Sequence, residues 1–284
     1  MAASLRRTFI KTTLVIAAIA GFAPQLALAE GGTLADIKAR GMLTVGTEAA
    51  YEPYEFVEDS KVVGYGHDIL EYMVRKLGVR LNQLNLPFQG LLPGLLTHKF
   101  DLVATSVGIT EERAKRFAFT RPIGVVHSLI VVSSSNQSIA KPEDIAGKIV
   151  GTQMGSSAQP MVNDYEQVLK AKKGKGYANV KLLQSYPDVE TALENGTLDV
   201  GVVPSNVLAV AMRKQPGKFK VIGEIGQPKL LAWVVNPNDK EILTFVNSTL
   251  DEMRANGKLA ELQKKWFGEA MDLPASGYLP QGAL

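Results

Sequence analysis

The feature that most constrains the fold is a regular alternation of short apolar segments with amphipathic ones. The stretch MLTVG at 42–46 has the composition of a strand, and DILEYMVRKL at 68–77 has the apolar spacing of a helix. Further strands are expected at 81–86 and 101–105, with a short helix at 89–96 between them. Strands that alternate with helices predict an α/β fold with mostly parallel sheets.

The same order of segments occurs again later in the chain. EDIAGKIVG at 143–151 matches ADIKARGMLTVG at 35–46, since each has a short helix, a turn, a strand and a glycine. ALENGTLDVGV at 192–202 matches GLLTHKFDLVA at 94–104, since each has a helix, a turn and an aspartate that begins a strand. Two echoes in the same order and at similar spacing predict two lobes of like topology, with chance similarity as the alternative.

The last part of the chain is expected to return to the first lobe. A strand is expected at 229–235, and two helical segments are expected within 240–266. If they pack on the first lobe, the backbone crosses between the lobes near 120–130 and near 222–232. Two crossings make a hinge over a cleft, and such clefts are usual ligand sites. The expected boundaries are 30–124 with 228–284 for lobe 1, and 125–227 for lobe 2.

The first 29 residues have the pattern of an export signal. A basic start is followed by an apolar stretch from Thr12 to Phe22 and by the small-x-small pattern Ala27-Leu28-Ala29 before Glu30. A membrane anchor is disfavoured, because this stretch has only about half of the ~20 residues that a span needs. We therefore expect a cleaved signal at 1–29 and a periplasmic protein. RRTFIK resembles the twin-arginine consensus, so the Sec and twin-arginine routes both stay open.

Charge and composition exclude several classes of function. The signal carries three of the 31 basic residues and none of the 28 acidic ones, which leaves a mature chain with 28 of each. A neutral chain gives no reason to expect a nucleic acid as partner. The absence of cysteine excludes disulfides and thiolate metal sites, and the three histidines are widely spaced. Because no nucleotide, metal or serine-nucleophile motif is present either, we expect no cofactor and no metal.

Loops that follow strands are the candidate sites, because ligands of α/β sheets lie beyond the carboxyl ends of the strands. In the loop TEAAYEPYEF, Tyr51 stands beside Glu48 and Glu52, and this mixture suits an organic cation or an amino group. For Tyr54 and Phe56 in the same loop, a place in the core is the favoured interpretation.

The segment ATSVGITEERAKRF at 104–117 is the most informative loop. Thr105, Ser106 and Gly108 make a small, hydroxyl-rich turn between a strand and a helix. Arg113 falls in the first turn of that helix, where a cation opposes the helix dipole by about 0.3–1 kcal/mol. A bound anion would remove this penalty, and a guanidinium holds a carboxylate by two hydrogen bonds. The alternative is surface pairing with one of the two glutamates that precede Arg113.

Two further loops are candidates. Gly155, Ser156 and Ser157 lie between a strand and a helix, where backbone N–H groups bind anions. A serine N-cap without a ligand is the simpler interpretation of that loop. Phe88 follows the strand at 81–86 and forms either an apolar wall of a pocket or a contact beneath its loop.

These loops, in this order, resemble the bacterial extracellular solute-binding proteins of family 3, which are periplasmic polar-amino-acid receptors of ABC importers. The resemblance covers the mature chain and is carried by GMLTVGTEAAYEPYEF, VGYGHDILEYMVRKLG, FQGLLPGLLTHKFDLVATSVGITEERAKRFAFTRP, AGKIVGTQMGSS and DEMRANGKLAELQKKWFG. It implies the two-lobed type II periplasmic-binding-protein fold with a two-strand hinge. It also implies a monomer that captures a small-molecule ligand by lobe closure and delivers it to an ABC transporter permease.

The resemblance implies roles for individual residues as well. Arg113 would hold the α-carboxylate of the ligand, and the serines at 156 and 157 would complete the grip from lobe 2. Tyr51 and Phe88 would sandwich the ligand's side chain. The full set of ligand-binding residues carried over by position is Glu48, Tyr51, Phe88, Thr105, Ser106, Gly108, Arg113, Gln153, Ser156 and Ser157.

The chain departs from the family at two positions. The receptors carry an acidic residue for the ligand's ammonium where this chain has Val203-Pro204-Ser205, and they usually carry a serine where it has Gly108. A buried ammonium without a partner costs several kcal/mol. Either Glu48 supplies the negative charge, or the ligand lacks a free α-amino group and is an organic acid, a modified amino acid or an opine-like compound.

An enzyme on the same fold is the alternative function. Exported cyclohexadienyl or arogenate dehydratases use a carboxylic acid in this cleft, and Glu48 and Glu52 are the candidates for such a proton donor here. Because no second positioned acid–base group is evident in the sequence, we expect a binding protein and not an enzyme.

Overall fold

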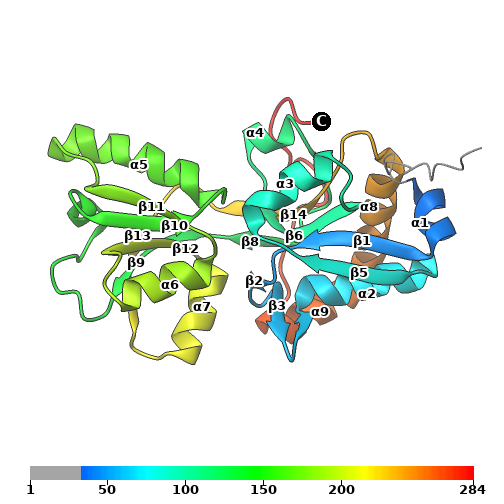
Figure 1. Ribbon diagram of the computed structural model, residues 1–284, viewed down its shortest axis with the longest axis horizontal. Helices are drawn as coiled ribbons and strands as arrows, with labels where there is room; N and C mark the ends of the chain where they lie inside the picture. The colour runs from blue at the N-terminus through cyan, green and yellow to red at the C-terminus, as the bar shows by residue number, and fades with distance from the viewer. Residues whose placement is uncertain (1–32) are drawn as a thin grey trace, which may run out of the picture.

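The computed structural model describes residues 33–284, so the expected signal at 1–29 lies outside the described residues. Two sheets flanked by helices lie next to each other along the long axis of the molecule (Figure 1). Each sheet with its helices is one lobe of a two-lobed α/β fold. Among residues 33–284, no helix is both long enough and apolar enough to cross a membrane.

The sheet of lobe 1 is mixed. Its strand order is β5-β1-β6-β14-β7, with β8 paired to β14. The β5-β1-β6 part is parallel, whereas β14 runs antiparallel to β6, β7 and β8. The strands are β1 Met42–Thr47, β5 Arg80–Asn85, β6 Leu102–Gly108, β7 Ala118–Phe119, β8 Gly124–Val126 and β14 Lys229–Val235.

Helices cover both faces of this sheet, with α3 on one face and α2 on the other (Figure 1). A small separate sheet, formed by β2 to β4, stands at the edge that faces lobe 2. The helices of lobe 1 are α1 Leu34–Arg40, α2 Tyr65–Leu77, α3 Phe88–Leu96, α4 Glu111–Ala114, α8 Lys240–Ala255 and α9 Lys258–Phe267, and the small sheet is β2 Ala50–Tyr51, β3 Glu55–Glu58 and β4 Lys61–Val63.

Lobe 2 has a mixed sheet in the order β11-β10-β12-β9-β13. Its β11-β10-β12 part is parallel, and β9 runs antiparallel to both of its neighbours. Helix α5 lies on one face, and α6 and α7 lie on the other (Figure 1). The elements are β9 Ser128–Ser133, η1 Pro142–Ile145, β10 Ile149–Gln153, α5 Ala158–Lys173, β11 Asn179–Leu183, α6 Tyr186–Glu194, β12 Val200–Pro204, α7 Ser205–Lys214 and β13 Phe219–Glu224.

The sequence echo corresponds to one hydrogen-bonding pattern used twice. In lobe 1 the Asp101 carboxylate accepts a hydrogen bond from the backbone amide of Thr44 at 2.9 Å. In lobe 2 the Asp199 carboxylate accepts a hydrogen bond from the backbone amide of Ile149 at 2.8 Å. Each aspartate thereby ties the start of one parallel strand to its neighbour. The repeated segments are therefore structurally equivalent, and chance similarity is not their explanation.

The glycine in each echo is required by a close approach. A Cβ on Gly46 would lie 2.7 Å from the Phe100 ring, and a Cβ on Gly151 would clash with Leu198. In both lobes the crowding residue comes directly before the aspartate of the echo. The glycine lets a large side chain under the sheet lie against the strand.

The backbone crosses between the lobes twice, within both expected segments. The first crossing runs from β8 to β9 through His127, and the second runs from β13 to β14 through 225–228. Lobe 1 is thus completed by a strand that comes from lobe 2, and this strand is antiparallel. The parallel character expected for the sheets is therefore confined to the three-strand part of each.

Candidate functional site

A small cavity lies between the lobes, where the carboxyl ends of β1, β6, β10 and β12 face one another. Its volume is about 20 Å³, which is room for about one water molecule. The cavity is lined by all ten residues that the sequence predicted, so the structure brings them together. The other lining residues are Val126, Ser128, Tyr186, Pro204 and Leu231.

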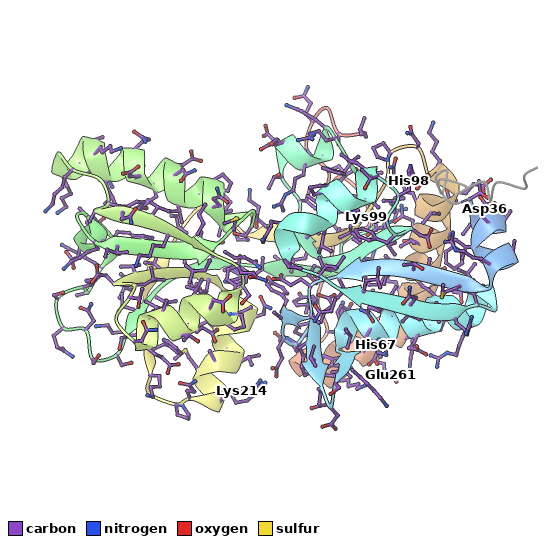
Figure 2. All side chains as sticks on the ribbon, in the orientation of Figure 1. Asp36, His67, His98, Lys99, Lys214 and Glu261 are labelled. Atoms are coloured by element: carbon purple, nitrogen blue, oxygen red, sulfur yellow. The ribbon has the colours of Figure 1, made fainter. Side chains whose placement is uncertain are left out.

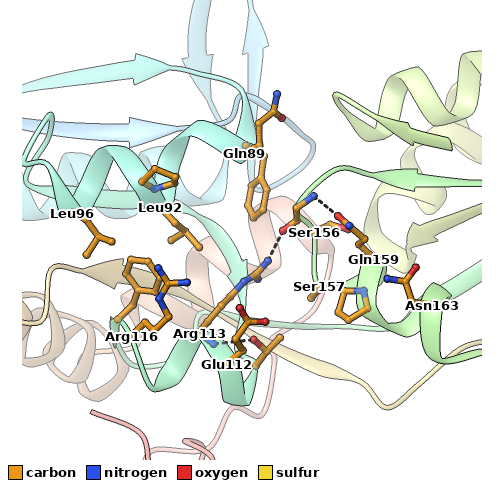
Figure 3. A pocket seen from close by; sticks show the side chains of 16 residues that line it. Gln89, Leu92, Leu96, Glu112, Arg113, Arg116, Ser156, Ser157, Gln159 and Asn163 are labelled. Carbon is orange, nitrogen blue, oxygen red and sulfur yellow. Dashed lines mark hydrogen bonds between the residues drawn. The ribbon is translucent and has the colours of Figure 1, made fainter. Parts of the chain in front are cut away.

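Arg113 bridges the lobes at this cavity. Thr110 caps the four-residue helix α4 by accepting from the Arg113 amide at 3.3 Å. The guanidinium donates through Nη1 to the Gly108 carbonyl at 2.9 Å and through Nη2 to the Gly155 carbonyl of lobe 2 at 2.6 Å. Its Cζ stands 5.6 Å from the centre of the Phe88 ring. Figure 3 shows the side chain reaching from α4 toward Ser156.

The positive charge of Arg113 has no acidic partner in residues 33–284. None of the ion pairs formed there includes it, so the surface pairing with a neighbouring glutamate does not occur. Desolvation lowers the pKa of Arg113 to about 10, and the residue stays protonated at neutral pH. A guanidinium that is held by carbonyls only can still pair with an anion.

The loop before α5 contributes unused hydrogen-bonding groups from lobe 2. Ser157 is the N-cap residue of α5, but its side chain makes no capping hydrogen bond. Ser156 is buried, and its hydroxyl has no partner among the described residues. The simple N-cap interpretation of these serines therefore does not hold. Buried hydroxyls are normally paired, so the Ser156 hydroxyl, which lies near that of Tyr186, is available to bind a further group.

Gly108 faces lobe 2 at the cavity and leaves no room for a side chain. A Cβ at this position would lie 2.6 Å from the Ser157 hydroxyl oxygen and 2.9 Å from the Ser157 Cβ. The space that a side chain at Gly108 would need is thus taken by lobe 2. Glycine at this position permits the observed contact.

Glu48 and Glu52, which the sequence treats alike, have different surroundings. Glu48 is buried and accepts a hydrogen bond from the Gln153 amide of lobe 2, which also donates to the Gln184 carbonyl at 3.1 Å. Burial raises the pKa of Glu48 to about 8. Glu52 lies outside the cavity and pairs with Lys214 of α7 across the cleft (Lys214 is labelled in Figure 2). Only Glu48 can contact a ligand in the cavity.

The aromatic residues also divide between the cavity and the core. Tyr51 lines the cavity, with its ring centre 5.9 Å from that of Tyr186. Tyr54 is buried in the core, as expected, whereas Phe56 is partly buried, with its ring centre 5.8 Å from that of Trp266. Phe88, at the start of α3, lines the cavity.

Sequence analysis missed one residue behind the cavity wall, Glu55, and four residues of the lining, Val126, Ser128, Tyr186 and Leu231. Tyr186 begins α6 shortly after β11, as Phe88 begins α3 shortly after β5. The repeat between the two lobes, extended to these segments, would therefore have predicted Tyr186. Glu55 is completely buried behind the cavity wall. No local pattern separates it from the other glutamates of its loop.

Wider openings flank the cavity on two sides. One, of about 470 Å³, lies between α3, α4 and the start of α5, and Arg113 borders both it and the cavity (Figure 3). The other, of about 510 Å³, lies between the small sheet of lobe 1 and α6 and α7 of lobe 2. The cavity is thus the narrow middle of a cleft that runs between the lobes.

None of the three histidines lines the cavity, and each contacts another protein side chain. His67 contacts Gln83 at 2.9 Å, and His127 contacts Glu224 at 2.7 Å. His98 stands 3.7 Å from Asp239, and Figure 2 shows it well apart from His67. Over residues 33–284, no group of three or more histidine or acidic residues is arranged to hold a metal ion.

Comparison with known proteins identifies related chains over nearly the whole length. The family model for "Bacterial extracellular solute-binding proteins, family 3" matches residues 43–269. The L-cystine-binding protein TcyA of Bacillus subtilis is 26% identical, and the match covers 84% of this chain and 86% of TcyA.

Solved structures with the same fold include an ancestral arginine-binding protein bound to arginine. It is 31% identical, the match covers 81% of this chain and 99% of that one, and the TM-score is 0.71. The ancestral amino-acid-binding protein AncCDT-1, described as a precursor of cyclohexadienyl dehydratase, is 26% identical, with 82% and 99% covered and a TM-score of 0.72.

Proposed function

The chain belongs to the bacterial extracellular solute-binding proteins of family 3, and from this premise we propose that it binds an amino acid, or a derivative with a carboxylate, in the cleft between its lobes. It then delivers this ligand to an ABC transporter permease. It acts as an exported monomer in the periplasm, with units at 30–124 with 228–284 and at 125–227. The observation that carries the proposal is the Arg113 guanidinium, which lies between the lobes without an acidic partner.

Arg113 binds the carboxylate of the ligand in this proposal. Its two terminal nitrogens now donate to backbone carbonyls, and a carboxylate offers two charged acceptors in the same planar geometry. The unpaired Ser156 hydroxyl and the Ser157 hydroxyl supply the lobe 2 side of this grip. Thr105, Ser106 and Gly108 form the opposite wall, and Gln153 and the aromatic residues surround the rest of the ligand.

Lobe opening is required before any ligand can enter. The closed cavity of about 20 Å³ is far below the roughly 300–1,000 Å³ of typical ligand sites. The two backbone crossings at His127 and 225–228 are the segments about which the lobes separate. A ligand that contacts both lobes only in the closed form shifts the population toward that form.

Glu48 supplies the negative charge for the ammonium of the ligand. The strand β12 ends at Pro204, which lines the cavity and brings no carboxylate. Glu48 is the one carboxyl among the residues that line this cavity. Its burial disfavours the ionised form, and an adjacent ammonium reverses this preference.

A thermal-shift screen tests the proposal. The panel contains L-arginine, L-cystine, L-glutamine, amines without a carboxylate, organic acids and opines. We expect at least one carboxylate-bearing compound to raise the melting temperature, because a ligand at 100 times its Kd stabilises the folded form by about 2.7 kcal/mol. Stabilisation by amines alone, or by no compound of the panel, would contradict the proposal.

The affinity for an amine-bearing ligand should rise with pH. The pKa of Glu48 is about 8 without ligand, and an ammonium lowers it in the complex. Between these two pKa values binding must release the proton of Glu48, and this release alone raises the affinity by up to about tenfold per pH unit and levels off above pH 8. Isothermal titration at pH 6, 7 and 8 measures this slope, which Glu48→Gln should reduce. A slope of opposite sign would show that Glu48 does not pair with an ammonium.

Catalysis is the second candidate function, favoured by one observation. Glu48 is largely protonated at neutral pH, which is the form that a general acid needs, and the AncCDT-1 structure is named as a dehydratase precursor. We propose binding without catalysis, because Glu48 is the one carboxyl group among the described residues that line the cavity, and burial raises the pKa values of the lining tyrosines Tyr51 and Tyr186. Prephenate and arogenate incubated with the purified protein should remain unchanged, and their enzyme-dependent loss would favour the dehydratase.

A further inference from the structure

Glu55 is a buried carboxyl group directly behind the cavity wall. It lies on β3, is 0% exposed, and accepts hydrogen bonds from three donors of β6. The Ser106 amide and the Ser106 hydroxyl each donate at 3.3 Å, and the Thr105 hydroxyl donates at 3.5 Å. Both hydroxyl-bearing residues also line the cavity, so they lie between Glu55 and a ligand.

No cation of residues 33–284 neutralises this carboxyl group. None of their ion pairs includes Glu55. The titratable groups that act on it or are acted on by it are the carboxyl of Glu48 and the hydroxyls of Tyr51, Tyr54 and Tyr65. A buried carboxyl group is costly to keep ionised when residues 33–284 bring no cation to it, so a positive group of a ligand would favour its charged form.

The chain makes room for Glu55 at a particular position. A Cβ on Gly66, the second residue of α2, would clash with the Oε1 atom of Glu55. The absence of a side chain at Gly66 therefore lets the carboxyl group reach the strand β6. The same close approach gives a way to displace Glu55 without changing its chemistry.

Hydrogen-bond chemistry connects Glu55 to the cavity. An ionised carboxylate only accepts hydrogen bonds, and a serine or threonine hydroxyl has a single proton to donate. When Thr105 and Ser106 donate to Glu55, their oxygens keep only lone pairs for the cavity. Two hydroxyl oxygens that present only lone pairs to the cavity can accept hydrogen bonds from an ammonium group, and they repel a second carboxylate.

Building on the proposed function, we propose that Glu55 is a positioning residue that directs the hydroxyl protons of Thr105 and Ser106 away from the cavity, so that this wall accepts hydrogen bonds from an amino group of the ligand. The ligand class is thereby narrowed to carboxylates that also carry an amine. Glu48 on one side and the two hydroxyls on the other then share the ammonium, and Arg113 holds the carboxylate.

Protonation of Glu55 reverses the polarity of the wall. A protonated carboxyl donates its own proton to one hydroxyl, which frees that hydroxyl to point into the cavity. Burial raises the pKa of Glu55 to about 8, and an ammonium beyond the hydroxyls favours the ionised form. Binding of an amine therefore releases protons from Glu55 as well as from Glu48.

The test compares each amino acid with its counterpart that lacks the amine. The pairs are L-arginine with 5-guanidinopentanoate, L-glutamine with glutaramate, and L-cystine with 3,3′-dithiodipropionate. We expect the wild-type protein to bind the amine-bearing member of at least one pair, with at least tenfold preference over its counterpart. Binding of only the counterparts would overturn the inference and leave the proposed function intact, whereas binding of no carboxylate, from these pairs or from the thermal-shift panel, contradicts both.

Two variants then locate the cause of the preference. Glu55→Gln keeps the shape but adds an amide donor, which turns at least one hydroxyl proton into the cavity. Gly66→Ala keeps Glu55 but displaces its carboxyl group. Each should weaken binding of the amine at least about tenfold and change binding of the counterpart less than threefold, with a smaller release of protons on binding.

Glu58→Gln is the matched control, because Glu58 is an exposed residue at the end of the same strand. It should leave both affinities unchanged. Melting temperatures of all variants establish that they are folded. If Glu55→Gln fails to fold, Gly66→Ala carries the test alone. An unchanged preference in a folded variant, or an equal loss for both members of a pair, would overturn the positioning role.

Discussion

Arg113→Ala is expected to abolish measurable binding of the ligand. Truncating one partner of a buried, hydrogen-bonded charge pair costs about 2–5 kcal/mol or more, which corresponds to about a 30- to 5,000-fold loss of affinity. The loss should lie at the high end, because residues 33–284 place no other cation beside the cavity to take the carboxylate. Isothermal titration with the compound found by the thermal-shift screen measures the effect.

Two further variants separate the role of Arg113 from general charge. Arg113→Lys keeps the charge but loses the planar fork, so an intermediate affinity is expected. Arg116→Ala removes a neighbouring, exposed arginine that lines the outer opening but not the cavity. The affinity of this variant for the ligand should stay within about twofold of the wild-type affinity. A folded Arg113→Ala protein with wild-type affinity would refute the role of this residue.

Gly108→Val is expected to prevent the lobes from closing. Its side chain would meet Ser157 of lobe 2, since even a Cβ would lie 2.6 Å from the hydroxyl oxygen. Overpacking of this kind costs about 1–3 kcal/mol, which corresponds to a loss of affinity of about 5- to 150-fold. Small-angle X-ray scattering should show that the ligand reduces the radius of gyration of the wild type but not of the variant.

Gly90→Ala is the control for that substitution. Gly90 lies within α3, and a Cβ there would meet nothing within 4 Å. Its affinity and its ligand-induced compaction should equal those of the wild type. If Gly108→Val binds and compacts like the wild type, the closed arrangement of the lobes is not the one that holds the ligand.

Much of the fold could be predicted because each lobe is built on local patterns. The strands at 42–46 and 229–235 and the two helices near the C-terminus occur where apolar periodicity predicts them. The equivalence of Asp101 and Asp199 could be predicted from the repeated segments, because in each lobe the aspartate accepts a hydrogen bond from the amide at the start of a neighbouring parallel strand. Local pattern does not show that β14 returns antiparallel to lobe 1, because this pairing joins residues far apart in sequence.

The candidate site was predictable for residues that follow parallel strands, and less so for the others. The carboxyl ends of β1, β6 and β10 necessarily meet at the cleft, so the residues after them gather there. Glu48 and Glu52 looked equivalent in one loop, yet only tertiary contacts decide that Glu52 pairs with Lys214 of lobe 2. Glu55 was missed for the same reason, because its partners on β6 lie about 50 residues away.

A crystal structure of the protein with its bound ligand tests the central claim most directly. We expect a carboxylate within hydrogen-bonding distance of both terminal nitrogens of Arg113, and an amino group between Glu48 and the hydroxyls of Thr105 and Ser106. The lobes should enclose the ligand in a cavity wider than the present one of about 20 Å³, with Ser157 on the lobe 2 side of the carboxylate. A ligand whose carboxylate faces away from Arg113, with the guanidinium still donating to the Gly155 carbonyl, would contradict the account.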